Sequence, residues 1–288
     1  MVACIPAYNE EKTIASVVVQ ALKYVDQVVV CDDGSEDMTS EIATGLGAAV
    51  IRHERNMGYG MALQSLFKEA RRLGADIMVT LDGDGQHDPK EIPRLVKPFE
   101  SGDVDIVIGS RFLDGSHSEA PRWRKAGIRL ITDLTSNGKL TDAQSGFRAY
   151  NKRALDSLVL TDEGMGVSTE VLLKAMEQGL SVVEVPVSVS YDSASSTRNP
   201  VVHGLIVVLS TVKYMSLRRP LLFYGLPGFV SLSVAAIFWV LTLRIFAAKQ
   251  TISTNIALIA LGATIVGLML MTTSMILWVL ISLIREKR

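Results

Sequence analysis

Cysteine is scarce in this chain of 288 residues, which contains only Cys4 and Cys31, both within short apolar segments. A thiol in such a segment is typical of a small buried hydrophobic side chain in a reducing compartment. We therefore expect neither a disulfide nor a catalytic thiol.

A surplus of charge is missing as well. Lys and Arg number 29 against 30 for Asp and Glu, so the formal net charge is −1. Proteins that bind nucleic acid generally carry a basic surplus, and its absence argues against nucleic acid as a partner. The chain also lacks internal repeats and low-complexity tracts, and its length suits one large domain or two modest ones.

Charged residues are absent altogether from Gln250 to Ile284, and Leu221 to Ala248 holds only Arg244. As helices, both stretches are long enough to cross a hydrocarbon core of roughly 30 Å. A buried helical hairpin is the alternative, but such segments are unusually long and uniformly apolar for one. The prediction is a transmembrane domain over 220–288, with helices at about 221–247 and 255–284 in contact with a lipid bilayer.

Basic residues flank both predicted spans. They are Lys213, Arg218 and Arg219 before the first span and Arg285, Lys287 and Arg288 after the second. Because cytosolic loops are enriched in Lys and Arg, we expect a cell-membrane protein with both termini in the cytosol. No signal peptide is expected, since the first residues have the pattern of a strand. The apolar stretch 201–219 suits an amphipathic helix in the membrane interface, or equally a core helix.

Residues 1–200 alternate between two patterns of hydrophobicity. Short β-branched segments predict strands at Val2–Ile5, Gln27–Cys31, Ala48–Arg52, Ile77–Leu81 and Ile106–Gly109. Helical periodicity lies between them at Glu10–Tyr24, Glu36–Leu46, Tyr59–Leu73 and Pro89–Glu100. A less regular continuation has strands near Ala143–Tyr150 and Val182–Ser190 and a helix at Gly166–Gln178. Such alternation predicts an α/β fold whose mostly parallel sheet is covered by helices on both faces.

Polar residues follow four of the predicted strands, at Pro6–Glu10, Asp32–Ser35, Asp82–Asp84 and Gly109–Arg111. Ligands of open parallel sheets bind beyond the carboxyl ends of the strands. One site at that edge would explain all four segments.

Asp82 and Asp84 stand two residues apart where the fourth strand ends. Residues at this spacing on a strand point to the same side, so both carboxylates could face one ion. Oxygen ligands suit Mg²⁺ or Mn²⁺, which few carboxylates hold and which water and substrate phosphates complete. We predict a divalent-cation site, although an exposed acidic turn would have the same sequence. An EF-hand is excluded, because His87 and Pro93 stand where it needs glycine and glutamate.

Six motifs occur in order along the chain. They are Ile5-Pro-Ala-Tyr-Asn-Glu10, Val30-Cys-Asp-Asp-Gly-Ser35, Asn56-Met-Gly-Tyr-Gly-Met-Ala62, Asp82-Gly-Asp-Gly-Gln-His87, Ile108-Gly-Ser-Arg111 and Gln144-Ser-Gly-Phe-Arg148. Together they resemble the family 2 glycosyltransferases of the GT-A fold, a Rossmann-like, mostly parallel sheet sandwiched by helices. Within that family the likeness is to the membrane-anchored synthases of polyprenyl-phosphate (dolichyl-phosphate) mannose, glucose and N-acetylglucosamine. It covers about residues 2–200, within an expected cytosolic catalytic domain of 1–200, and the Gln-x-x-Arg-Trp sequence of processive synthases is absent.

The resemblance implies a site for a nucleotide sugar. Its residues would be Pro6, Ala7, Tyr8, Glu10, Asp33, Gly58, Gly60, Asp82, Gly83 and Asp84. Tyr8 would pack against base or ribose, and Glu10 would accept from a ribose hydroxyl or only favour a helix dipole. Asp33 would hydrogen-bond the base while Asp32 holds the turn. The Gly58-Tyr-Gly60 segment would let the backbone approach the nucleotide, or would simply start a helix.

The resemblance also implies a metal, Mg²⁺ or Mn²⁺. Asp84 and Gln86 would contact it directly, and Asp82 would face the ribose or the metal. The ion would bridge the donor's diphosphate and stabilise the charge that builds on it as the sugar leaves. His87 would be hydrogen-bonded beyond the metal ligands, or would be a surface turn residue.

A polyprenyl monophosphate needs no general base, because a second pKa near 6 leaves it largely dianionic at pH 7. Positive charge to hold it matters more, since guanidinium pairs bidentately with phosphate oxygens. The candidates for the acceptor phosphate are Arg111, Arg124, Arg129 and Arg198, and the expected catalytic residues are Asp82, Asp84, Arg111, Arg129 and Arg198. Each arginine could instead be a solvated or headgroup-facing charge.

These inferences describe an inverting, metal-dependent transferase that moves a hexose from a nucleotide sugar to polyprenyl phosphate. UDP-glucose and UDP-N-acetylglucosamine are favoured over GDP-mannose, because the mannose synthases tend to carry Asp-Ala-Asp where this chain has Asp82-Gly-Asp84. Two alternatives stay open: another membrane-lipid acceptor, for which Asp82 or Asp142 would serve as base, and an inactive membrane scaffold of the same fold. Homo-oligomers formed through the hairpin stay open too.

Overall fold

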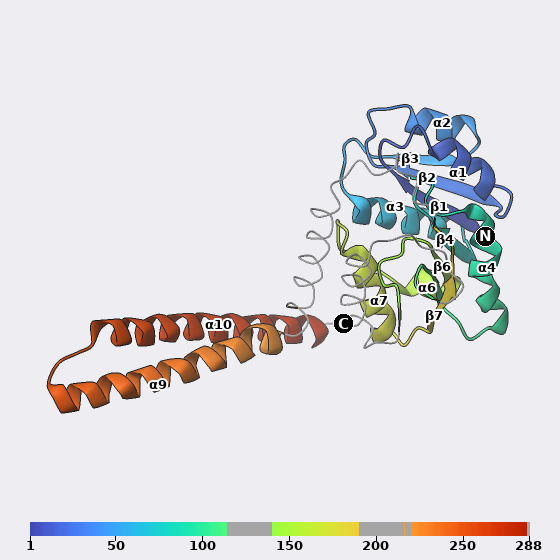
Figure 1. The fold of residues 1–288 in the computed structure, drawn as a ribbon. Helices are drawn as coiled ribbons and strands as arrows, with labels where there is room; N and C mark the ends of the chain where they lie inside the picture. The colour runs from blue at the N-terminus through green and yellow to red at the C-terminus, as the bar shows by residue number, and fades with distance from the viewer. Residues whose placement is uncertain (114–139, 190–215, 217–219, 287–288) are drawn as a thin grey trace. The chain divides into compact units, whose positions relative to one another are not determined.

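The computed structural model describes residues 1–113, 140–189, 216 and 220–286. The chain divides into two compact units, Met1–Thr211 and Val212–Arg288. Among the described residues the first unit is an α/β unit and the second is a helical hairpin (Figure 1). Of the predicted interfacial helix over 201–219, all but Ser216 lies outside the described residues.

A sheet of seven strands, counted over the described residues, forms the centre of the first unit, in the order β3-β2-β1-β4-β6-β5-β7. The strands are β1 (Val2–Ala7), β2 (Gln27–Asp32), β3 (Ala49–Arg52), β4 (Ile77–Thr80), β5 (Ile106–Ser110), β6 (Arg148–Asn151) and β7 (Val182–Pro186). Neighbouring strands are parallel except where β6 pairs with β4 and β5. The predicted mostly parallel sheet is therefore confirmed, with one antiparallel strand inside it.

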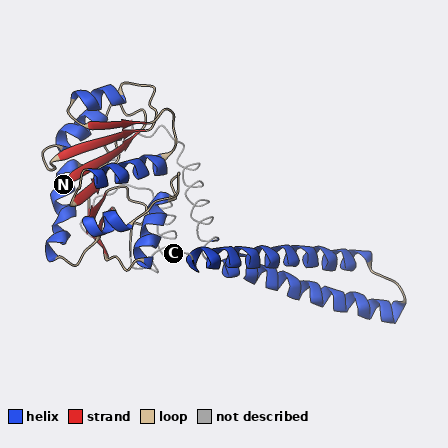
Figure 2. Ribbon diagram, turned by 180° about the vertical axis from the view of Figure 1, so that it is seen from behind, coloured by secondary structure: helices blue, strands red, loops and turns tan. Residues whose placement is uncertain are grey.

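Helices cover both faces of this sheet (Figure 2). On one face lie α3 (Tyr59–Arg72), α6 (Lys152–Ser157) and α7 (Val167–Glu177). On the other lie α1 (Ile14–Ala21), α2 (Thr39–Gly45) and α4 (Ile92–Val96). The two-residue period of the strands divides their side chains between two cores. In β1, Val2 and Cys4 join the α3 side while Ala3 and Ile5 join the α1 side.

Both cysteines are packing residues, as predicted. Cys4 and Cys31 are free, fully buried thiols in adjacent strands. Burial raises the pKa of both thiols, that of Cys31 to about 12. Because the thiolate is the reactive form, neither side chain is a nucleophile at neutral pH.

Proline divides one predicted helix into pieces. In place of a single helix over Pro89–Glu100 the structure has a 3₁₀ turn at Pro89–Glu91, then α4, then a second 3₁₀ turn at Lys97–Ser101. Each piece carries a proline in its first two positions, where the missing N–H would have no helical partner.

Side-chain hydrogen bonds shorten two other predicted elements. The strand predicted near Ala143–Tyr150 begins only at Arg148, because the Arg148 guanidinium donates to the carbonyls of Ala143 and Ser145 and holds that segment as a loop. The helix predicted from Glu10 begins only at Ile14. Its expected first residue instead donates its backbone N–H to Thr39 Oγ1.

The second unit begins with a π-helical turn at Leu221–Gly225 and continues as α9 (Leu226–Lys249) and α10 (Thr254–Glu286). Two segments of it, Leu221–Lys249 and Thr254–Ile281, are long and apolar enough to cross a membrane, with mean hydropathies of 2.1 and 2.2. Their large side chains are mostly exposed, as lipid-facing side chains would be. The two predicted apolar helices and their short link are therefore present.

Close backbone approach and polar contacts join α9 to α10. A Cβ on Gly228 would lie 3.1 Å from Met271, and one on Gly267 would lie 2.7 Å from Leu232. Trp239 Nε1 donates to Thr264 Oγ1 over 3.1 Å. Small residues and interhelical hydrogen bonds are the features that join helices in lipid.

Gly60 provides a test of the packing around α3. A Cβ there would lie 2.1 Å from the carbonyl oxygen of Asp162, whereas nothing lies within 4 Å of a Cβ on Gly45 in α2. We expect Gly60→Ala to lower the free energy of unfolding by about 1–3 kcal/mol. Gly45→Ala, the control, should raise it or leave it within about 1 kcal/mol. Thermal unfolding of the full chain in detergent would measure both, and equal stabilities would contradict this packing.

Candidate active site

The ends of β1, β2 and β4 bring three polar loops to one edge of the sheet. Ala7 of β1 pairs with Asp32 of β2, so the loops that follow both strands start side by side. Asn9 holds them together: its N–H donates to Ser35 Oγ over 2.9 Å and its Oδ1 accepts from Glu36 N over 2.9 Å. The Asn9 backbone is left-handed, with φ of 56°. The predicted convergence of these strand ends is thus present.

Asp32 and Asp33 have different partners. Asp32 is fully buried, and its Oδ1 accepts from Ser35 N over 2.9 Å, so it holds the turn as expected. Asp33 accepts three hydrogen bonds: from Met57 N at 2.9 Å, from Gly58 N at 2.8 Å and from His53 Nδ1 at 2.7 Å. A carboxylate offers about four acceptor positions, so one remains for a ligand.

A polar cavity of about 480 Å³ opens beside these loops. It is lined by Tyr8, Gly34, Ser35, Glu36, Arg52, His53, Glu54, Arg55 and Asn56. The family resemblance predicts that the nucleotide binds beside Tyr8 and the loop after β2. The cavity therefore provides room at the expected position.

Gly58 and Gly60 have a local packing role. Gly58 precedes α3 with a φ of 99°, and Gly60 N donates to the Glu163 carbonyl over 3.0 Å. The backbone of Asp162 and Glu163 comes close enough to exclude a Cβ at either glycine. This supports the alternative that the pair starts a helix, and approach to a nucleotide stays a prediction.

Asp82 and Asp84 follow β4 at the same edge. Both carboxylates are partly buried, and burial raises the pKa of each, with the charge of Asp82 adding to the rise at Asp84. Tyr59 Oη donates to Asp82 Oδ1 over 3.4 Å, and Gln86 N donates to Asp84 Oδ1 over 3.0 Å. The loop is fixed by Thr13, whose Oγ1 donates to the Gly83 carbonyl over 2.7 Å.

These residues fit a hard divalent cation. Two carboxylates with raised pKa values are a site where positive charge would be stabilising. Among the described residues no group of three His, Cys, Asp or Glu side chains could hold a metal by itself. Mg²⁺ and Mn²⁺ do not require such a group, because one or two carboxylates and substrate phosphates suffice. With the Gln86 amide, the donor set suits an ion bound together with a diphosphate.

Glu10 lies half-buried next to this acidic loop. The pKa of its carboxyl is raised to about 7, chiefly by burial and also by the nearby Asp84 and Asp82, although a hydrogen bond with Thr13 opposes the rise. The Thr13 Oγ1 to Glu10 Oε2 distance is 3.1 Å. Glu10 thus titrates near neutral pH instead of in the acid range.

Arg111 stands directly after β5 and is paired with Asp142. Nε donates to Oδ2 over 2.6 Å and Nη2 donates to Oδ1 over 2.8 Å, a bidentate pair in which Asp142 is fully buried. Glu184 of β7 accepts from Asp142 N and Thr141 N, each over 2.8 Å. The guanidinium of Arg111 is therefore held in one orientation at the end of β5.

Some residues of the candidate site were not predicted from the sequence, and some predicted residues lie outside the described part of the chain. Glu184 and His53 were not predicted, although a lone charged residue in the apolar segment Val182–Pro186 was a signal. Arg124, Arg129 and Arg198 lie outside the described residues.

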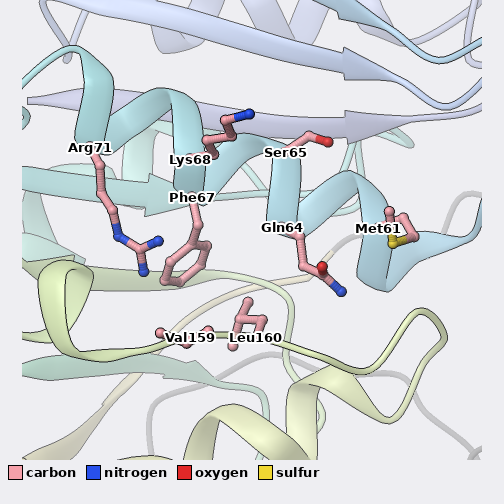
Figure 3. A pocket seen from close by; sticks show the side chains of 8 residues that line it. All are labelled: Met61, Gln64, Ser65, Phe67, Lys68, Arg71, Val159 and Leu160. Atoms are coloured by element: carbon pink, nitrogen blue, oxygen red, sulfur yellow. The ribbon is translucent and has the colours of Figure 1, made fainter.

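A second hollow, of about 340 Å³, lies between α3 and the segment at Val159 and Leu160 (Figure 3). Phe67 and Arg71 point toward that segment in the figure. The Arg71 guanidinium donates to the carbonyls of Leu155 and Leu158. Arg71 therefore serves packing, and no residue that lines this hollow belongs to the acidic loop.

Comparison with known proteins identifies the family. The sequence model named Glycosyl transferase family 2 matches residues 2–159. The chain belongs to this family. It is therefore a glycosyltransferase enzyme, and the resemblance drawn from its six motifs is confirmed.

Individual relatives agree with this assignment. A UDP-N-acetylglucosamine–dolichyl-phosphate N-acetylglucosaminyltransferase of Methanococcus voltae is 36% identical, over 67% of this chain and 87% of the relative. A dolichyl-phosphate hexose transferase of Haloferax volcanii is 33% identical, over 72% and 90%. Glucosyl-3-phosphoglycerate synthase from Mycobacterium tuberculosis, solved with Mn²⁺, UDP-glucose and phosphoglyceric acid, has a TM-score of 0.60 at 25% identity, over 74% of this chain and 78% of that one. The predicted GT-A fold is confirmed.

The raised pKa of Glu10 predicts a pH dependence of stability. Its folded value of about 7 exceeds the ordinary 4.5, so the folded chain binds more protons than the unfolded chain between these values. Stability therefore falls as pH rises from about 4.5 to 7. We expect Glu10→Gln to raise the Tm of the ligand-free protein relative to wild type at pH 8 and much less at pH 5. Exposed Glu100→Gln is the control, and parallel pH curves for wild type and Glu10→Gln would contradict the assignment.

Proposed function

We propose that this glycosyltransferase moves a hexose from a nucleotide sugar to a polyprenyl (dolichyl) phosphate, with inversion at the anomeric carbon. The names of the relatives in Methanococcus voltae and Haloferax volcanii support a dolichyl-phosphate acceptor. The two apolar helices support a place at the membrane, where such an acceptor resides.

The observation that carries the proposal is the pairing of Asp142 with Arg111. A hydroxyl acceptor would need a carboxylate base, and Asp142 was one of two candidates. Because Asp142 is fully buried and bidentately bound, it is not available for proton transfer. A phosphate acceptor needs no base, since it is already ionised at neutral pH. In this proposal the guanidinium that Asp142 orients would contact the acceptor phosphate.

Asp82, Asp84 and Gln86 would hold the Mg²⁺ or Mn²⁺. When bound, such an ion neutralises the diphosphate as it leaves with the bonding electrons. The neighbour solved with Mn²⁺ and UDP-glucose supports this need for metal. The chain's own residues would do the rest. Asp33 and Tyr8 would bind the nucleotide, and Arg111 would orient the acceptor phosphate for attack from the opposite side of the anomeric carbon.

The proposed arrangement places the catalytic domain, residues 1–200, and both termini in the cytosol, where nucleotide sugars are made. A hairpin over 220–288 would anchor it, with 201–219 at the membrane interface. UDP-glucose and UDP-N-acetylglucosamine remain the favoured donors, with GDP-mannose the alternative. Transfer to another membrane lipid remains the second candidate, with Asp82 as the base.

One assay tests reaction, donor and metal together. The purified full chain is incubated with Mg²⁺ or Mn²⁺, dolichyl phosphate and labelled UDP-glucose, UDP-N-acetylglucosamine or GDP-mannose. We expect label to enter the organic phase with one donor and EDTA to prevent it. Transfer only to a neutral lipid would establish the hydroxyl-acceptor alternative, and binding of every donor without transfer would favour the inactive scaffold.

Replacing Asp84 should separate catalysis from folding. We expect Asp84→Asn to lower turnover by about 100-fold or more, the size of effect seen when one electrostatic contact to the leaving charge is lost. The ligand-free variant should be at least as stable as wild type, because burial disfavours the ionised carboxylate. Exposed Asp103→Asn is the matched control. Near-normal turnover by Asp84→Asn would remove Asp84 from the metal site.

Arg111 should act on the acceptor alone. Arg111→Lys keeps the positive charge but loses the planar guanidinium that Asp142 orients toward the proposed phosphate, so we expect the KM for polyprenyl phosphate to rise about tenfold with little change in the KM for the donor. Arg153→Lys, which alters the pair between the exposed Arg153 side chain and the buried Asp105, is the control. If both constants stay unchanged, Arg111 serves only to hold Asp142.

A further inference from the structure

His87 is a buried imidazole to which no described residue gives a hydrogen bond. It is 4% exposed, and within the described part of the chain neither Nδ1 nor Nε2 has a hydrogen-bond partner. Its ring stacks on Phe147 with centroids 5.3 Å apart. One carboxylate oxygen lies near it: Asp82 Oδ2 is 3.7 Å from Nδ1.

A buried imidazole whose nitrogens are unpaired makes the folded protein less stable, so a histidine at this position needs another explanation. A neutral imidazole carries one donor and one acceptor, and leaving these unpaired away from water is destabilising. An apolar side chain would fill the same space against Phe147 without that cost. The gap to Asp82 is only about 0.8 Å longer than a hydrogen bond of about 2.9 Å.

Few hydrogen bonds hold the Asp82 carboxylate among the described residues. Its described contacts are the long hydrogen bond from Tyr59 and the backbone of Gly146, where an added Cβ would lie 2.7 Å from Oδ2. Because Gly146 has no side chain, the Asp82 carboxylate fits between Tyr59 and His87. No strong donor fixes this carboxylate in the described structure.

We propose that His87 is a positioning residue, whose Nδ1–H hydrogen-bonds Asp82 when nucleotide and divalent ion bind and holds that carboxylate toward them. This rests on the proposed function, because it assumes that Asp82 faces the metal or the ribose. Groups that orient metal ligands in this way typically change metal affinity by 10–100-fold when they are lost. His87 is thus retained for binding, at the expense of stability in the ligand-free protein.

Three substitutions separate this role from packing. His87→Leu removes both ring nitrogens, His87→Asn keeps an N–H near the position of Nδ1, and His87→Gln moves the amide toward the position of Nε2. Phe147→Leu is the packing control, because it removes the stacked ring and keeps His87. All variants are made in the full chain and purified in detergent.

The measurements are the Tm of the ligand-free protein and the affinities for Mn²⁺ alone, by electron paramagnetic resonance, and for Mn²⁺ with UDP or GDP, by calorimetry. We expect His87→Leu to bind Mn²⁺ about 10–100-fold more weakly, with a Tm equal to wild type or up to about 4 °C higher. His87→Asn should recover most of the affinity, while His87→Gln should not. Phe147→Leu should lower the Tm and leave the affinity near that of wild type.

Two results would overturn the inference in distinguishable ways. If His87→Leu lowers the Tm and binds Mn²⁺ as wild type does, His87 is a core residue only and the proposed function is unaffected. If wild type itself binds Mn²⁺ neither alone nor with UDP or GDP, the metal part of the proposed function fails, and the role of His87 fails with it.

Discussion

Carboxylates partly or fully removed from water at one edge of the sheet are the constraint on which the rest of this site depends. Each of them needs hydrogen-bond donors or positive charge to compensate for lost water, and the described residues supply these unequally. Backbone and imidazole N–H groups satisfy Asp33, and a guanidinium satisfies Asp142. Asp82 and Asp84 have only weak or single donors, and burial raises the pKa of both. The incompletely paired members of the set are those best suited to bind a positively charged ligand.

The architecture was accessible from the sequence because two periodicities alternate clearly over the first unit. The strand at Val182–Pro186 and the helix at Val167–Glu177 were found even in the less regular part. The ends of helices and strands were harder to predict, because they depend on contacts between residues distant in sequence. Helix α1 starts at Ile14 and not at Glu10, whose backbone N–H contacts Thr39, a residue distant in sequence. The antiparallel direction of β6 had no sequence signal, since its pairing with β4 and β5 is set by the whole sheet.

The candidate site likewise has features that the sequence predicted and features that it did not. Motifs at strand ends identified the acidic loop and Arg111, because the ends of parallel strands converge whatever the details. The hydrogen-bond partners of the site residues could not be predicted from the sequence. It did not indicate that Asp142 would pair with Arg111 instead of serving as a base, or that Glu184 would bind the segment before β6. Such choices depend on distances between loops that lie more than thirty residues apart in sequence.

The Arg111–Asp142 pair also joins two residues that lie 31 positions apart in the sequence. It joins the residue after β5 to the segment before β6, and Ser110 Oγ lies 2.6 Å from Thr141 Oγ1 beside it. The cost of closing a loop grows only slowly with its length, so the sheet is insensitive to how many residues lie between the two partners. Adding or removing residues between Arg111 and Asp142 would therefore change the free energy of folding only slightly.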